Sequence, residues 1–307
     1  ASYTVIYEVY DSFGNRATAT RTVNVNPIPL ADNSGASIPD LLSNMIPVKW
    51  SGTTWIKADV NNYATNEWYD YDAKVWANAV TVTAATLATY QSAALGTQVL
   101  MNDILTFLVW APRYKYAIPS GTLPRAITIV FESKATTKST GDATGTNYLT
   151  HPAFTFNGIE VSGLWVGKFE PTGTISAITI KPNLASVRTQ TISAMFNATR
   201  AMQNSGNAYG FATTDIDTHM MKNMEWGAVA YLSHSKYGKN AEITINSSSS
   251  YYTGGGGSDA YITNVAQSTT GNIFGIYDMS GGAFEYVMGN YNSKVTSSGF
   301  ASLPGTP

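Results

Sequence analysis

The stretch of sequence that decides the fold is residues 271–290, which read GNIFGIYDMSGGAFEYVMGN. Apolar side chains flank a Ser-Gly-Gly turn at residues 280–282, and an acid, Glu285, lies among them. We expect this stretch to supply strands on either side of the turn. Such a turn can serve an active centre, a metal site or the architecture alone, and the rest of the sequence helps to choose between these uses.

The composition predicts a β-rich protein with few charges on its surface. The chain has 307 residues, of which 44% are hydrophobic, so a sizeable core can form. Only 12% of the residues are charged, about half the usual share of about 25%, so Ser, Thr, Asn and Gly must supply the polar surface. Such surfaces suit extracellular proteins. Because the net charge is -2 and no long run of Lys or Arg occurs, we expect neither nucleic acid nor an anionic membrane as a partner.

Cysteine is absent, so these residues form no disulfide, thiolate metal site or thiol nucleophile. No run of about 18 or more apolar residues occurs, and we expect no membrane span in this segment. The sequence has no initiator Met and no signal peptide, and Ala1 enters a strand pattern almost at once. We therefore expect the chain to be a piece of a longer precursor.

Residues 1–25 alternate with a period of two on both sides of the turn-forming segment DSFGNR, which predicts a β-hairpin. Two strands alone are marginally stable in water, so a partner sheet must come from elsewhere. The pattern resembles the last two strands of bacterial immunoglobulin-like repeats, and the alternative is a hairpin packed on the next domain. We assign residues 1–26 to this fragment and residues 27–44, which are rich in Pro and small polar residues, to a linker.

Residues 45–100 predict a small β-meander that is rich in aromatic side chains, with short strands separated by SGTT and NNYATN. Exposed Trp and Tyr rings can stack on sugars through their apolar faces, which makes Trp68 and Tyr71 candidate ligand-binding residues. The interpretation that we favour is a core made of these rings, because a short meander has few other bulky residues. The rings are those of Trp50, Trp55, Trp68, Tyr69, Tyr71 and Trp76.

From residue 101 onward the pattern predicts strands and two helices. The strands are expected within residues 103–118 (with a break at Pro112), 126–133 and 163–173. The helices are expected at residues 191–203 and from residue 223 to just before Gly238. Asn223 can cap the second helix, and Gly238 is a stop signal just past its end.

Four segments in this order carry a family resemblance: FLVWAPRYKYAI, GLWVGKFEPTG, MMKNMEWGAVAYLSHSKYG and NIFGIYDMSGGAFEYV. Together they resemble the formylglycine-generating-enzyme-like (sulfatase-modifying factor) family, a branch of the C-type-lectin-like fold. We call residues 271–290 the hallmark stretch, because they are similar to the family pattern N-x-F-G-L-Y-D-M-x-G-N-V-W-E-W. The resemblance implies an α+β fold in which a C-type-lectin-like domain at residues 101–307 follows the meander and the immunoglobulin-like fragment.

The resemblance also implies structural roles in the hallmark stretch. Gly275 and Gly281 would permit backbone angles that bulkier residues resist, and Tyr277, Met279 and Phe284 would lie in the core. The structural residues of the pattern are Gly275, Tyr277, Asp278, Met279, Gly281, Phe284, Trp226 and Trp165.

A calcium site is a further implication of the resemblance, because the Glu that matches Glu285 helps to hold calcium in catalytic relatives. Here Glu285 with carbonyls around Ser280, Gly281 and Ala283 would bind Ca²⁺, a hard cation that takes several oxygen ligands. Gly282 stands where the family usually has Asn. The alternative is that Glu285, as a carboxylate that needs a partner, accepts loop N–H groups or pairs with a Lys or Arg.

The enzymes of this family use Cys with copper, and a related branch uses a His-based iron site. This chain has no Cys, and its histidines, His151, His219 and His234, are not spaced as a helical pair. We therefore expect no catalytic residue in the chain. The Cys pair of the enzymes follows the hallmark stretch, however, and this chain stops at Pro307 in a loop-like sequence, so we expect the last domain to be incomplete.

The sequence favours a non-catalytic binding and structural module of a bacterial surface appendage or phage particle, with an extracellular place on the cell surface or virion. Loops around residues 204–218 and 253–262 would contact a host glycan or surface protein, and Tyr251, Tyr252 and Tyr261 are the candidate stacking residues. One alternative is a structural subunit of a pilus, filament or virion that joins neighbouring copies. The other is a formylglycine-generating-type oxidoreductase whose catalytic end is missing from this chain.

Overall fold

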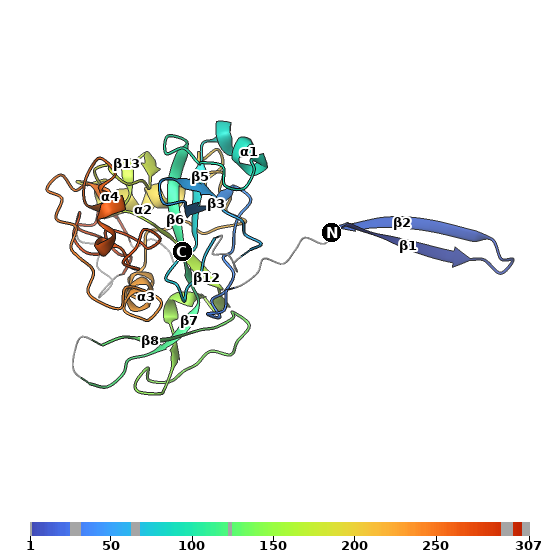
Figure 1. The fold of residues 1–307 in the computed structure, drawn as a ribbon, viewed down its shortest axis with the longest axis horizontal. Coiled ribbons are helices and arrows are strands. Elements are labelled where there is room, and N and C mark those ends of the chain that lie inside the picture. The colour runs from blue at the N-terminus through green and yellow to red at the C-terminus, as the bar shows by residue number, and fades with distance from the viewer. Residues whose placement is uncertain (1, 25–31, 63–67, 122–124, 290–296, 303–307) are drawn as a thin grey trace.

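The computed structural model describes residues 2–24, 32–62, 68–121, 125–289 and 297–302. Strands hold 28% of the chain and helices 16%, so the protein is mixed but β-rich, with mostly small antiparallel sheets (Figure 1). In these residues no helix has the length and apolar character that crossing a membrane requires.

The predicted N-terminal hairpin is present. β1 (Ser2–Tyr10) pairs antiparallel with β2 (Arg16–Asn24) in an unbroken register. Asp11 closes the turn, because its carboxylate accepts hydrogen bonds from the backbone N–H groups of Phe13 and Asn15. Every side chain from residue 4 to residue 23 is exposed, so no described residue covers either face of the hairpin. Its assignment to an immunoglobulin-like repeat stays a prediction.

The centre of the fold is a five-stranded antiparallel sheet in the order β12-β6-β5-β3-β4. Its strands are β3 (Met45–Trp50), β4 (Trp55–Lys57), β5 (Asn78–Val82), β6 (Ile104–Pro112) and β12 (Gly163–Gly167). β5 and β6 are buried on nearly every residue. The hydroxyls of Thr81 and Thr106 form a hydrogen bond of 2.7 Å between these two strands. The sheet joins strands from both sides of the boundary predicted at residue 100.

The aromatic rings of the predicted meander lie in the core of this sheet, as we favoured. The side chains that are at most 2% exposed are Trp55, Trp68, Tyr69, Tyr71 and Trp76. Buried indole and phenol groups need hydrogen-bond partners, and these have them: Trp68 Nε1 donates to Asn78 O at 2.7 Å, and Tyr71 Oη donates to Trp110 O at 2.7 Å. Trp50 alone of the predicted set remains partly exposed in the structure.

The described part of the predicted linker, residues 32–44, packs against the sheet. Two indoles donate to its backbone: Trp110 Nε1 to Ser37 O at 3.2 Å and Trp165 Nε1 to Asp40 O at 2.7 Å. Asp32 is 6% exposed, and its carboxylate accepts the backbone N–H of Tyr71 at 2.6 Å. The Pro-rich composition of the linker could not predict this packing, because the residues that it contacts lie far along the chain. Residues 27–31 lie outside the described residues.

Smaller elements surround the central sheet. A three-stranded sheet has the order β8-β7-β9, with β7 (Tyr114–Ala117), β8 (Thr128–Phe131) and β9 (Leu149–Thr150). Two short hairpins pair β10 (Thr155–Phe156) with β11 (Ile159–Glu160) and β13 (Thr172–Thr174) with β14 (Ala177–Thr179). As predicted, the long strand around residue 110 breaks at Pro112, where β6 ends and β7 follows.

The helices are α1 (Ala84–Ser92), α2 (Ile192–Ala201), α3 (Asn223–Ser233) and the single-turn α4 (Ala260–Thr263), with 3₁₀ turns η1 (Pro152–Phe154), η2 (Thr253–Gly255) and η3 (Val265–Gln267). Both helices predicted from the sequence are present. The predicted cap of α3 at Asn223 is wrong: Lys222 is the N-cap residue, and its backbone N–H donates to the carboxylate of Glu225 at 2.7 Å. This contact is the glutamate half of a capping box, because a Lys side chain cannot accept the reciprocal bond.

The hallmark stretch forms no strand over its described residues 271–289, so that expectation is wrong. It makes only isolated bridges, Lys222 with Met288 and Asn246 with Gly281. Tyr277 is buried and Met279 packs partly against the core, but Phe284 is 98% exposed, so its predicted core position is wrong. The reason is the positive φ of Gly281 and Gly282, which turns the chain outward before Phe284.

A buried ion-pair network fastens the three-stranded sheet to the β10–β11 hairpin. Arg113 is fully buried, and its Nε donates to Glu132 at 3.0 Å while its Nη1 donates to Glu160 and to Phe154 O. Thr150 Oγ1 donates to the same carboxylate of Glu132 at 2.8 Å. Removing one partner of such a network leaves a buried charge without compensation.

We therefore expect Arg113→Ala to lower the free energy of unfolding by about 3–5 kcal/mol, because the buried carboxylate of Glu132 loses its cation. Urea unfolding followed by tryptophan fluorescence measures the change. The matched control is Arg16→Ala, which removes an exposed ion pair with Glu8 and should cost at most about 1 kcal/mol. Equal losses for the two variants would contradict a structural role for the buried network.

Candidate functional site

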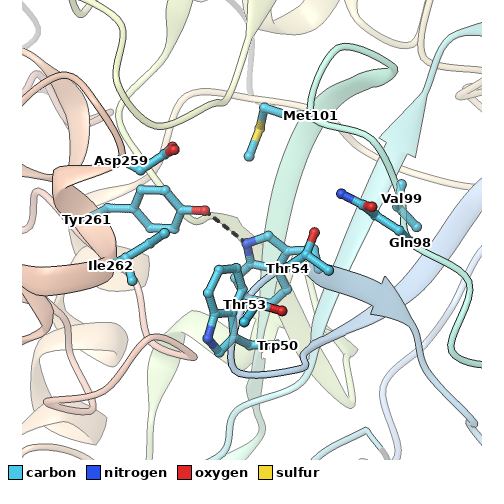
Figure 2. Close-up of a pocket in the computed structure, with 10 residues that line it drawn as sticks. Trp50, Thr53, Thr54, Gln98, Val99, Met101, Asp259, Tyr261 and Ile262 are labelled. Atoms are coloured by element: carbon cyan, nitrogen blue, oxygen red, sulfur yellow. Dashed lines mark hydrogen bonds between the residues drawn. The ribbon is translucent and has the colours of Figure 1, made fainter.

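Three separate segments meet around a hollow of about 240 Å³ on the surface (Figure 2). The β3–β4 turn contributes two tryptophans and two threonines, the segment at residues 98–101 contributes an amide and apolar groups, and the start of α4 contributes Asp259, Tyr261 and Ile262. We call this feature the aromatic hollow. Its residues are Trp50, Thr53, Thr54, Trp55, Gln98, Val99, Met101, Asp259, Tyr261 and Ile262.

The β3–β4 turn sets the position of the two tryptophans. Trp50 and Trp55 are opposite each other in the register, with ring centroids 5.5 Å apart in an edge-to-face arrangement. Gly52, at φ +100°, supplies the left-handed residue that the tight turn requires, and Ser51 N donates to Thr54 O at 2.9 Å. Because Trp55 is 2% exposed and Trp50 is partly exposed, Trp50 is the ring that the turn offers to solvent.

Tyr261 forms the opposite wall. Trp55 Nε1 donates to Tyr261 Oη at 3.3 Å, the bond drawn in Figure 2, and Tyr277 Oη donates to Tyr261 O at 2.9 Å. Asp259, the residue that precedes α4, is exposed beside this wall and accepts a hydrogen bond from Asn183 Nδ2 at 2.6 Å. The wall is therefore held by hydrogen bonds to the sheet and to the hallmark stretch.

A buried lysine supports the same group of rings. Lys168 is fully buried directly after β12, and its Nζ donates to the backbone carbonyls of Ile273 and Gly275, each at 2.7 Å. The same Nζ lies 5.1 Å from the centroid of the Trp55 ring and 5.5 Å from that of Tyr277. Burial holds the pKa of Lys168 well below its usual value. This side chain joins the hallmark stretch to the floor of the hollow.

The hollow offers an aromatic stacking face and several hydrogen-bonding side chains. A partly exposed indole face can stack on the apolar face of a sugar ring, while the exposed side chains of Thr53, Gln98 and Asp259 can hydrogen-bond its hydroxyls. A small number of polar groups around an aromatic wall is the usual composition of a ligand site. The size of the hollow suits one ring of a ligand.

The structure separates the five predicted stacking residues. Tyr251 and Tyr252 are exposed at 37% and 36%, whereas Tyr261 lines the hollow with only 2% of its surface exposed. Trp68 and Tyr71 are buried in the core, so neither ring is open to a ligand in this structure. The sequence analysis missed Trp50 and Gln98 as site residues. The signal for Trp50 was the segment WSGTTW, in which two tryptophans flank a tight turn.

Two of the groups predicted to hold calcium have another partner. Glu285 is exposed and accepts a hydrogen bond from Trp226 Nε1 at 2.9 Å, and Ser280 O accepts the backbone N–H of Asn246 at 2.8 Å. The carboxylate at the turn is instead that of Glu170, which accepts the backbone N–H of Ala283 at 3.0 Å. Sequence reasoning missed Glu170 because it lies on a distant segment. The calcium site stays a prediction.

The other structural residues of the hallmark pattern are held as follows. Asp278 is 1% exposed and accepts Gly254 N at 2.9 Å and Asn246 Nδ2 at 2.9 Å. Gly275 is required for space, because a Cβ there would lie 2.6 Å from the hydroxyl of Thr270. Trp165 packs against the ring of Trp110 at 5.2 Å.

The three histidines lie in three different environments. His151 is 4% exposed among tyrosines, and burial lowers its pKa to about 4. His219 Nε2 lies 2.9 Å from the carboxylate of Glu225; burial works to lower its pKa, but Glu225 and Asp217 outweigh this effect and raise it. His234 is the C-cap residue of α3. Within the described ranges, no group of three or more His, Asp or Glu side chains is arranged to hold a metal.

Comparisons of the chain with protein-family models, with curated proteins and with solved structures found no match. The resemblance of the hallmark stretch to the formylglycine-generating-enzyme-like family therefore stays a prediction.

The environment of Glu170 predicts a pH-dependent stability. Burial raises its pKa to about 8, although its hydrogen bond from Ser186 acts against this, and the nearby Asp278 and Glu285 raise it further. An unfolded Glu loses its proton near pH 4.5, so the folded state binds more protons between these two values. Stability should therefore fall as the pH rises from about 5 to about 8.

We expect Glu170→Gln to remove most of this fall, which is on the order of 2–4 kcal/mol in the parent, because the amide cannot ionise. A smaller fall below about pH 6 remains, because burial also raises the pKa of Asp278, to about 6. Thermal unfolding at a series of pH values measures it. The control is Glu242→Gln, which changes an exposed acid and should follow the parent curve. A parent whose stability rises steadily from pH 5 to 8, with the Glu170 variant parallel to it, would show that this carboxyl is ionised in the folded protein.

Proposed function

We propose that this chain is a non-catalytic, extracellular binding module of a bacterial surface appendage or phage particle, and that its aromatic hollow binds a neutral sugar ring. The observation that supports this most directly is the partly exposed Trp50 ring, held against Trp55 and surrounded by hydroxyl, amide and carboxylate groups. The low share of charged residues and the absence of Cys are in keeping with an extracellular place.

We also propose that residues 101–307 adopt the C-type-lectin-like arrangement of the formylglycine-generating-enzyme-like family. Support comes from the contact between two segments of the resemblance that lie far apart in the sequence. Lys168 in GLWVGKFEPTG donates to two carbonyls of the hallmark stretch, and Lys168 O accepts the backbone N–H of Tyr277 at 2.8 Å. In this proposal the hallmark stretch is architecture, which presents loops on a rigid scaffold.

We expect Trp50→Ala to weaken binding of a neutral disaccharide by about tenfold or more, because the variant loses the stacking face. A glycan array selects the disaccharide, and isothermal titration calorimetry measures the affinity. Gln98→Ala, an exposed polar change in the same hollow, should weaken it by a smaller factor without affecting the core.

Phe284→Ala is the matched control, since it removes a fully exposed ring elsewhere and should leave the affinity unchanged. The proposal fails if no neutral glycan on the array binds the protein. It also fails if the Trp50 variant binds the disaccharide as tightly as the parent and the Phe284 control do.

A structural subunit is a second candidate function, and the N-terminal hairpin favours it. Val5, Tyr7 and Val9 alternate along β1 and so share one face. Tyr7 and Val9 lie opposite Ala19 and Ala17 of β2, and Val5 lies opposite Arg21. Their side chains are 38–65% exposed, and no described residue covers them. In an assembly, this apolar face would pack against a neighbouring copy.

In that case the parent protein associates as its concentration rises, and Val9→Asp, which places a charge on the apolar face beside the turn, stays monomeric. Sedimentation velocity measures both. The control Thr18→Asp lies on the opposite face and should associate as the parent does. A parent that stays monomeric over the whole concentration range would remove the support for this candidate.

A further inference from the structure

A second hollow, of about 430 Å³, lies between the β13–β14 hairpin and residues 185–190. Its volume falls within the range of about 300–1,000 Å³ that is usual for small-molecule sites. The lining includes Thr174, Ser186, Arg188 and Gln190, and Arg188 is its one charged residue. We call this feature the arginine hollow.

The guanidinium of Arg188 is held by an aromatic ring. Its Cζ lies 3.9 Å from the centroid of the Tyr251 ring, and both side chains are exposed. The ion pairs formed within the described residues do not include Arg188. Stacking occupies the face of a guanidinium and leaves its N–H groups at the edges free to donate. An oriented cation that has no counter-charge among the described residues therefore borders the hollow.

The backbone on both sides of this stack is strained. Thr189 has φ +60° and Tyr251 has φ +57°, a region that β-branched and bulky residues rarely adopt. Each such residue costs on the order of 1–3 kcal/mol and persists only where its surroundings fix it. Here Val187 N donates to Pro171 O at 2.8 Å, and Ser186 N donates to Tyr251 O at 3.0 Å. The strain therefore lies at Tyr251, whose ring stacks on the guanidinium, and at Thr189, which follows Arg188 in the chain.

The acid that Ser186 contacts does not cancel this positive charge at neutral pH. Ser186 Oγ, at the lining of the hollow, donates to the carboxyl of Glu170. Since the pKa of that carboxyl is raised to about 8 by burial, it is mostly protonated at pH 7. An anion beside Arg188 meets a cation on one side and a largely neutral carboxyl group behind Ser186.

We propose that the arginine hollow binds the carboxylate of an acidic sugar, with Arg188 as the group that recognises the acid. A guanidinium edge matches the two oxygens of a carboxylate and donates two parallel hydrogen bonds to them. Thr174 and Gln190 then bond the sugar hydroxyls. This site is separate from the aromatic hollow and takes a different ligand class.

The test is a calorimetric titration of the full chain with three disaccharides of equal size, one ending in glucuronic acid, one carrying a sulfate ester and one neutral. We expect the glucuronic acid disaccharide to bind most tightly. Arg188→Ala should weaken it by about tenfold or more, and Arg188→Lys by several-fold, because an ammonium keeps the charge but lacks the planar pair of donors. Lys134→Ala, an exposed change of the same net charge, should change it less than about twofold.

Three results would overturn the proposal. The first is that the glucuronic acid disaccharide binds no more tightly than the neutral one, and the second is that it binds the Arg188→Ala variant as well as the parent. The third is equal binding of the sulfated disaccharide with full competition by inorganic sulfate, which would make the site a general anion site. Trp50→Ala should leave this binding unchanged, so failure of the aromatic hollow and failure of the arginine hollow give different patterns.

Discussion

The structure depends on the buried amine of Lys168. Its two hydrogen bonds to Ile273 O and Gly275 O connect the end of the central sheet to a stretch that has no strand of its own. A sheet would normally satisfy these carbonyls through its ladder, but here one side chain does so. Three aromatic rings close over the amine, within 6.0 Å of it, and exclude water from these bonds. The irregular hallmark stretch is thereby tied to the central sheet without a strand ladder of its own.

Other parts of the interior are also connected by a few buried ionisable side chains. The protein has few charged residues, yet several of them are buried: Lys168 against carbonyls, Arg113 between carboxylates, and Glu170 against Ser186 and a backbone N–H. Each connects segments that are distant in the sequence. Buried polar contacts of this kind fix which segments meet, whereas the hydrophobic effect alone would allow many arrangements. The surface hollows are formed where these connected segments come together.

Much of the local structure could be predicted from the sequence, because it follows from nearby residues. The period of two gave the N-terminal hairpin, Pro112 marked the end of β6, and the apolar pattern located α2 and α3. Phe284 was misplaced because its neighbours are apolar, and only the φ angles of the two preceding glycines show that the chain turns outward. Glu170 and Trp50 were missed because their roles depend on Ser186, Ala283 and Tyr261, which lie far away in the chain.

The packing of residues 32–44 has a consequence for how the protein can be divided. The carbonyls of Ser37 and Asp40 accept hydrogen bonds from indoles of β6 and β12, which lie on the far side of the meander in the sequence. A recombinant fragment that began at Met45, the first residue of β3, would leave both indole N–H groups without their acceptors and would uncover Trp110. A unit for expression or domain fusion therefore has to include residues 32–44.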